Sequence, residues 1–189
     1  MSNRIPPEYV GATMAKLPEP ILLAAERMAK KEPNDNGELA ISLIGPVGSG
    51  KTFIAWAIAD YFVQTQEFCK FPVFYTESEL LDRLRHAAHS KKSENYGETF
   101  HSVTKKSPEL LIIDDFGATK QTDFSIELLT DLLEYRISWH LPTVITSNLR
   151  FDDVKAVQQA VDVYGERIVS RLAGRFCSFI IDGKDRRKG

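Results

Sequence analysis

Eight consecutive residues constrain this chain more than any other feature. Positions 45 to 52 fit the pattern Gly, four residues, Gly, Lys and Thr, which forms a phosphate-binding loop between a strand and a helix. The apolar run Leu39–Ile44 precedes the loop as a predicted strand, and apolar residues at helical spacing follow it. Backbone N–H groups and a helix N-terminus in such a turn favour bound phosphates. The sequence therefore predicts a nucleoside triphosphate site formed by Gly45, Pro46, Val47, Gly48, Ser49, Gly50, Lys51 and Thr52.

Two side chains of this loop have distinct predicted roles. Lys51 is expected to reach the β- and γ-phosphates, and the Thr52 hydroxyl is expected to ligate Mg²⁺. The expected cofactors are therefore ATP and Mg²⁺. The alternative is a chance match to the pattern, and the strand and helix on the correct sides of the loop argue against it.

The composition favours one globular domain. The chain has 189 residues, of which 43% are hydrophobic, and this is enough for one substantial core. Cys69 and Cys177 stand far apart in no metal-type spacing, and no apolar run is long enough to cross a bilayer. We therefore expect a cytoplasmic protein without membrane contact. The formal net charge of -2 excludes a uniformly basic surface, so contacts with nucleic acid would need local patches.

Apolar runs and helical stripes alternate along the chain. Strands are predicted at 39–44, 71–75, 110–113, 142–146 and 176–181, and helices at 20–31, directly after the phosphate loop, at 77–88 and at 122–139. This alternation indicates an α/β fold of three layers, with a central parallel sheet of about five strands between helices.

A second motif lies at the end of the third predicted strand. The apolar run 110–113 leads into Asp114 and Asp115, as in a Walker B strand, whose carboxyl end lies against the phosphate loop. Asp114 is the candidate for holding the Mg²⁺ shell, and Asp115 for polarising the attacking water. Strands often end in Asp at a turn, so the motif depends on the phosphate loop upstream for its interpretation.

The fourth predicted strand ends in Thr146-Ser147-Asn148. Ligands of parallel sheets lie outside the carboxyl ends of the strands, so an amide there can hydrogen-bond the γ-phosphate or the lytic water. Asn148 is the candidate for that role. The alternative is that Asn148 caps a helix beginning near residues 151–153.

Several segments resemble the AAA+ ATPases and, more closely, the DnaC/DnaI-type replicative helicase loaders and their IstB-like relatives. These segments are Ile5–Tyr9, Gly45–Thr52, Ile112–Gly117, Leu141–Leu149 and Gly165–Leu172. The resemblance covers nearly the whole chain. It implies a P-loop NTPase with an AAA+ core and no full helical lid. It also implies an ATPase, weak as a monomer, that self-assembles on ATP, contacts single-stranded DNA and binds a replicative helicase.

We divide the chain accordingly into a lead-in with a short helix at residues 1–37 and an AAA+ ATPase domain at residues 38–189. Loaders normally carry an N-terminal domain that grips the helicase, and IstB-type proteins also usually have a larger N-terminal portion. We therefore expect the helicase-binding element to be missing, reduced to residues 1–37, or supplied by another chain.

The resemblance also assigns roles to arginines. Arg171 matches the arginine finger that reaches the ATP of a neighbouring subunit, and Arg167, one helical turn earlier, shares its face. Arg187 matches the sensor II cation that contacts the nucleotide of its own subunit, with Arg186 as the second choice. The alternatives are arginines on a solvated helix and a basic, solubilising tail.

Residues 80–106 form the candidate DNA contact. Basic side chains outnumber acidic ones there in an otherwise acidic protein, and Tyr96 and Phe100 stand among them. By family analogy this segment faces the central channel of an assembly, where cations track a phosphate backbone and aromatic rings stack on bases. The alternative is a solvated helix and loop. The basic residues are Arg83, Arg85, Lys91, Lys92, Lys105 and Lys106.

Four functions remain in competition. The leading one is a replicative helicase loader, and an IstB-like transposition helper ATPase shares every catalytic motif with it. A small P-loop kinase is disfavoured by the Asp114-Asp115 pair and by the Ser147-Asn148 strand end. A nucleotide-gated binding module that hardly hydrolyses stays open, because Asp115 stands where AAA+ sites commonly have the longer Glu.

Overall fold

The computed structural model of this chain describes residues 6–33, 37, 39–65, 72–89, 110–150 and 154–182. Within these ranges five parallel strands form one sheet, in the order β2-β3-β4-β1-β5. Their bounds are Ala40–Ile44 for β1, Val73–Thr76 for β2, Leu111–Phe116 for β3, Thr143–Ser147 for β4 and Cys177–Ile180 for β5. The predicted parallel sheet of five strands is confirmed.

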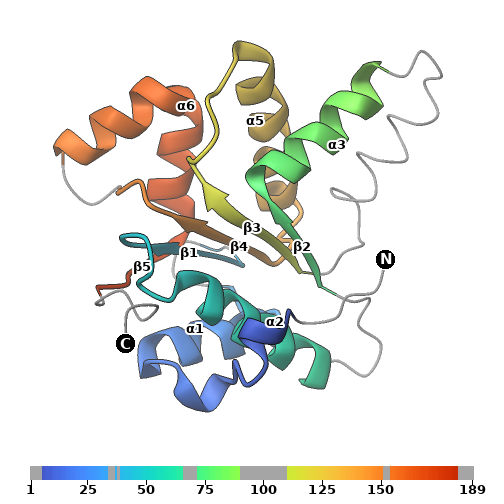
Figure 1. Ribbon diagram of the computed structural model, residues 1–189, viewed down its shortest axis with the longest axis vertical. Coiled ribbons are helices and arrows are strands. Elements are labelled where there is room, and N and C mark those ends of the chain that lie inside the picture. Colours follow the sequence, from blue (N-terminus) through green and yellow to red (C-terminus); the bar gives the residue numbers. More distant parts are fainter. Residues whose placement is uncertain are drawn as a thin grey trace.

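Helices cover both faces of the sheet (Figure 1). On one face lie α1 (Glu19–Ala29) and α2 (Lys51–Thr65), and on the other α3 (Glu77–His89), α5 (Asp123–Ser138) and α6 (Val154–Arg175). Two short 3₁₀ helices, η1 (Pro7–Tyr9) and η2 (Met14–Lys16), precede α1. The three-layer α/β fold is therefore also confirmed. Among these helices none is both long and apolar enough to cross a membrane.

The two faces of the sheet each have their own hydrophobic core. Ile21, Ala25 and Met28 of α1 pack with α2 and β1 on one face, so α1 belongs to the same core as the sheet. Leucines of α3, α5 and α6 pack against β3 and β4 on the other face. Every residue of β1 and β4 is buried, because both strands lie inside the sheet with both faces covered.

The third strand includes both acids that were predicted at its end. The apolar run 110–113 leads into Asp114 and Asp115 as expected, and β3 continues one residue further to Phe116. Its pairing with β4 shifts register between Ile113 and Phe116, as in a β-bulge, and Asp115 has φ 53. Both acids therefore lie inside a paired strand, because β4 extends far enough to pair beyond them.

Helix α6 consists of two segments. Gly165 has φ 77 and ψ 161, which is outside the helical region, so the axis kinks there. A glycine adopts this positive φ without steric cost, whereas other residues are strained in it. We refer to residues 166–175, which contain Arg167 and Arg171, as the finger segment.

Candidate functional site

The phosphate loop connects β1 to α2, and its glycines are needed for its shape. Gly48 and Gly50 have φ of 79 and 99, which disfavour any side chain. A Cβ built on Gly45 would lie 2.3 Å from the backbone oxygen of Ile181, so only glycine fits beside the end of β5. The N–H groups of the first turn of α2 have no acceptor within the helix and are available to an anion.

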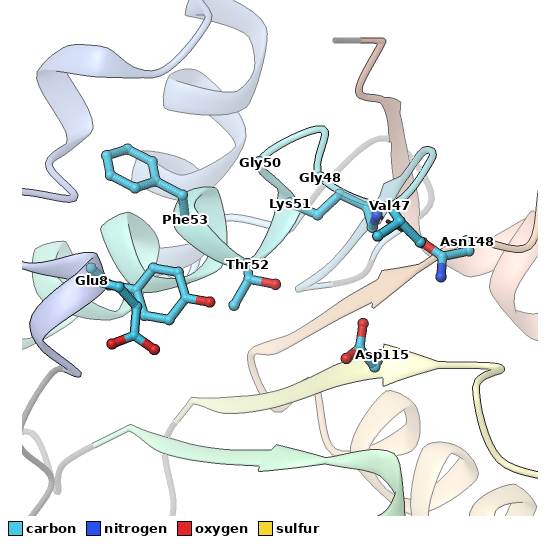
Figure 2. A pocket seen from close by; sticks show the side chains of 10 residues that line it. Glu8, Val47, Gly48, Gly50, Lys51, Thr52, Phe53, Asp115 and Asn148 are labelled. Atoms are coloured by element: carbon cyan, nitrogen blue, oxygen red, sulfur yellow. Dashed lines mark hydrogen bonds between the residues drawn. The ribbon is translucent and has the colours of Figure 1, made fainter. Parts of the chain in front are cut away.

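Lys51 is the first residue of α2 and is only 5% exposed. Its Nζ donates to the Gly45 and Pro46 carbonyl oxygens at 2.8 Å each and to the Asn148 Oδ1 at 2.9 Å. Figure 2 shows the lysine side chain running under the loop toward Asn148. A buried ammonium with three donors is thus held where phosphate oxygens of a nucleotide would compete for it.

Asp114 and Thr52 form a compact oxygen cluster beside Lys51. The Thr52 hydroxyl lies 3.1 and 3.2 Å from the two carboxylate oxygens of Asp114, and the Thr146 hydroxyl donates to the same carboxylate at 2.5 Å. Burial raises the pKa of Asp114, against the opposing effect of the hydrogen bonds from Thr146 and Thr52. Carboxylate and hydroxyl oxygens are the ligands that Mg²⁺ prefers, so this donor set fits the ion. Thr52 and Asp114 are the residues that would hold it.

The bulge in β3 turns Asp115 into the site. Its backbone N–H donates to the Thr146 Oγ1 at 3.0 Å, and its side chain lines the same cavity as Lys51 and Thr52. Figure 2 shows the Asp115 carboxylate directed into the space between Thr52 and Asn148. Consecutive strand residues ordinarily point to opposite faces, so the left-handed backbone at Asp115 lets both acids serve one site.

The cavity around these side chains has a volume of about 330 Å³. Asn148 lies in it with its side-chain oxygen accepting from Lys51, and residues 151–153, where the capped helix was predicted to begin, lie outside the described residues. Three wall residues were not foreseen, namely Glu8 and Tyr9 of η1 and Phe53 of α2. The residues lining it are Glu8, Tyr9, Val47, Gly48, Gly50, Lys51, Thr52, Phe53, Asp115 and Asn148.

A second cavity, of about 550 Å³, lies against the same loop and shares Gly50 and Phe53 with the first. Its walls come from the η2–α1 region, α2 and the end of β5, and they are largely apolar. Ser49 also lines it, and among the described residues its buried Oγ has no hydrogen-bond partner. The phosphate loop thus borders space on two sides, one lined by Lys51 and Asp115 and the other by Ser49.

The arginines of α6 lie outside this cavity. Arg171, 28% exposed, forms an ion pair with Glu134 of α5 and donates to the Arg167 carbonyl oxygen at 2.8 Å. Arg167, 76% exposed, approaches the same Glu134 carboxylate at 3.3 Å. The two arginines therefore share one face, as their spacing predicted. Arg186 and Arg187 lie outside the described residues, as do residues 151–153 and 90–106.

Thr146 is a further site residue that sequence reasoning missed. It donates to Asp114 and accepts from the backbone of Asp115, so it positions both acids. In the sequence, Thr146 could have been noted as a hydroxyl residue two positions before Asn148, at the end of a predicted strand. In the structure this strand pairs with β3, and the Thr146 hydroxyl contacts the bulge at Asp115.

The sequence matches a known family over most of its length. The profile of the family described as IstB-like ATP binding protein matches residues 34–188. The chain belongs to this family. The curated replicative helicase loader DnaI of Bacillus subtilis (strain 168) is 27% identical over 165 residues, which cover 83% of this chain and 50% of that protein. The chain thus spans about half of the length of this relative, and 39% of a second one from the same organism.

Solved structures support the same fold for this IstB-like chain. The crystal structure of the DnaC helicase loader is similar with a TM-score of 0.73 and 22% identity, covering 94% of this chain and 100% of that one. The crystal structure of DnaI is similar with a TM-score of 0.70 and 24% identity, covering 97% and 94%. The expected resemblance to DnaC/DnaI-type proteins with IstB-like relatives is confirmed, and the core is of the AAA+ type.

Proposed function

We propose that this chain is an ATP-hydrolysing AAA+ protein of the helicase-loader type. The observation that carries the proposal is that three kinds of group meet at the carboxyl edge of the sheet. They are the ammonium of Lys51, the metal-ligating oxygens of Thr52 and Asp114, and the carboxylate of Asp115. Lys51 and Thr52 come from α2, Asp114 and Asp115 from β3, and Asn148 from the end of β4. This set can bind a phosphate chain, hold a divalent cation and polarise water in one place.

Each residue has a separate role in the proposal. Lys51 and the N–H groups of the loop bind phosphate, and bound Mg²⁺ supplies charge neutralisation beside Thr52 and Asp114. Asp115 accepts a proton from, or orients, the attacking water. Asn148 holds Lys51 and presents its amide N–H₂ to the cavity, where it can donate to a phosphate oxygen or to the water.

Asp115→Asn is expected to separate binding from hydrolysis. The amide keeps the size of the side chain but cannot take a proton, so ATP affinity should stay within a few-fold while turnover falls by about 10²-fold or more. Equilibrium binding of a nucleotide and phosphate release under saturating ATP measure the two quantities. Turnover at the parent rate would assign the activation of water to another group.

The type of partner protein distinguishes a helicase loader from a helper ATPase in transposition. The likeness to a replicative helicase loader supports helicase loading, and the IstB-like family match supports a helper ATPase in transposition. For the first function, the full chain with ATP should raise the amount of hexameric replicative helicase placed on closed circular single-stranded DNA. For the second, it should bind a transposase and stimulate DNA strand transfer. Helicase placement that is unchanged by the chain and by ATP would contradict the loader function.

We also propose that single-stranded DNA contacts the basic segment 80–106, which begins within α3. Two of its arginines have partners within the chain: Arg83 stacks over the Tyr75 ring at 4.9 Å, and Arg85 donates to the Ser125 Oγ at 2.6 Å. The cations left for DNA are therefore Lys91, Lys92, Lys105 and Lys106, outside the described residues. Binding that weakens with rising salt in proportion to the number of phosphate contacts would support this contact.

A further inference from the structure

A buried carboxylate lies outside the catalytic cavity, at the point where three segments of the chain meet. Glu77, the first residue of α3, is only 1% exposed. Its Oε2 accepts from the Gln121 amide at 3.1 Å and from the backbone N–H groups of Gly117 and Thr119 at 3.4 Å each. Its Oε1 accepts from the Tyr164 hydroxyl. The loop it binds begins at Gly117, directly after the end of β3 at Phe116, so Glu77 connects the strand of Asp114 and Asp115 to α6.

Tyr164 completes this connection and is itself fully buried. Its ring stacks on Phe116, the residue after Asp115, with ring centroids 4.5 Å apart and an interplanar angle of 17°. Tyr164 is also the last residue before the kink at Gly165. The Tyr164 side chain thus contacts β3 through its ring and Glu77 through its hydroxyl, and it stands two residues before the finger segment.

The protonation of the two side chains favours a lasting hydrogen bond between Tyr164 and Glu77. Burial raises the pKa of Tyr164, and the neighbouring Glu77 carboxylate adds to this effect, so the phenol keeps its proton and donates. Burial also raises the pKa of Glu77, with the hydrogen bond from Tyr164 opposing it. A hydrogen bond to a buried acceptor is costly to leave unmade, so the tyrosine has one preferred position. Beyond the kink, Ile168, Val169 and Leu172 pack the finger segment into the same core as Tyr164, so a fixed Tyr164 defines where that packing begins.

We infer that Glu77 and Tyr164 are positioning residues that set where the finger segment, and with it Arg171, stands relative to the catalytic strand. The inference rests on the proposed ATPase function together with the role that the family resemblance implies for Arg171, action on the ATP of a neighbouring subunit. Neither residue lines the catalytic cavity among the described residues, so neither contacts the nucleotide's reacting phosphate in its own subunit. Both act through the placement of Arg171, which lies seven residues beyond Tyr164 and on the far side of the kink.

The test measures finger donation separately from site chemistry. Arg171→Ala supplies intact sites without a finger, and Asp115→Asn supplies fingers without an active site. In mixtures of the two, only a site facing an intact finger can turn over. The comparison is between Asp115→Asn alone and Asp115→Asn combined with Tyr164→Phe as finger donors. With Tyr164→Phe added, recovered turnover should fall by about tenfold or more, because small misplacements of a catalytic group are costly.

A matched control removes a hydroxyl from a tyrosine on the other face of the sheet. Tyr61→Phe changes a half-buried side chain of α2 that packs in the other core, and as an added substitution in the finger donor it should change recovery less than twofold. Glu77→Gln addresses the bond to Tyr164 from its other end and should lower recovery in the same direction, because a neutral amide accepts more weakly than a carboxylate. It also serves if Tyr164→Phe does not fold.

The possible results distinguish failure of this inference from failure of the proposed function. Nucleotide affinity and assembly of each donor are measured alongside turnover, and both should stay near those of Asp115→Asn alone. If Asp115→Asn restores activity and the donor with Tyr164→Phe restores it equally, the inference is wrong and the proposed function stands. If Asp115→Asn restores nothing, action of Arg171 in a neighbouring subunit is wrong and the inference falls with it.

Discussion

Replacing Lys51 with Ala should lower the affinity for ATP by about 10²-fold or more while the protein stays folded. The ammonium is the buried cation of the loop and lies within 2.9 Å of two loop carbonyl oxygens and Asn148. A charge-assisted hydrogen bond contributes about 1.5–3 kcal/mol, and each 1.4 kcal/mol is about tenfold in affinity. Two such contacts to phosphate oxygens account for the expected loss. Titration calorimetry with a non-hydrolysable ATP analogue measures it.

Lys16 offers a matched control for this substitution. Its Nζ donates to the Gly11 carbonyl oxygen at 2.9 Å and lies 5.8 Å from the centre of the Phe53 ring, beside the apolar cavity. Lys16→Ala removes the same charge from the same side of the molecule, so affinity should change by only a few-fold. Thermal unfolding of both variants checks the fold. Affinity near the parent value for Lys51→Ala, with an intact fold, would contradict the phosphate-loop assignment.

The layered fold was predictable because its signals are local. Each buried strand is a short apolar run flanked by turn residues, and the phosphate loop fixes which strand precedes which helix. The predicted strand at 142–146 is shifted by one residue from β4, and that at 39–44 has the same end as β1. Parallel pairing follows from the helices that connect successive strands.

The finer geometry of the site was not predictable, because it depends on contacts between distant residues. The bulge at Asp115 requires the Thr146 hydroxyl, which comes from a different strand. The wall of the cavity formed by Glu8 and Tyr9 requires η1 to reach α2, where the Tyr9 ring lies 6.0 Å from that of Trp56. No periodicity along one segment encodes such pairs, so a single sequence gave the residue types without their partners.

Arg171→Ala is expected to bind ATP nearly normally and to lose about 10³-fold or more in turnover, the range attributed to an arginine finger supplied from outside the site. Normal binding follows from the position of Arg171, which lies on α6 and pairs with Glu134 rather than lining the catalytic cavity. If the finger comes from a neighbour, the specific activity of the parent should also rise with protein concentration. Dilute protein should be a poor ATPase.

Arg167→Ala is the matched control for the finger. It removes an arginine one turn away that contacts the same Glu134, but from a side chain that is 76% exposed. A general effect of charge on this face would lower turnover similarly in both variants, whereas a finger at Arg171 predicts a much smaller loss for Arg167→Ala. Nucleotide affinity should be unchanged in both.

Mixing Arg171→Ala with Asp115→Asn should restore part of the lost activity, although each variant alone is nearly inactive. An intact Asp115 site of the first can then face an intact Arg171 of the second, so recovery should peak at intermediate mixing ratios. Recovery should also require assembly, which light scattering in the presence of an ATP analogue measures. With assembly established for both variants, activity that never exceeds the sum of the separate proteins would mean that Arg171 acts within its own subunit or only in packing against Glu134.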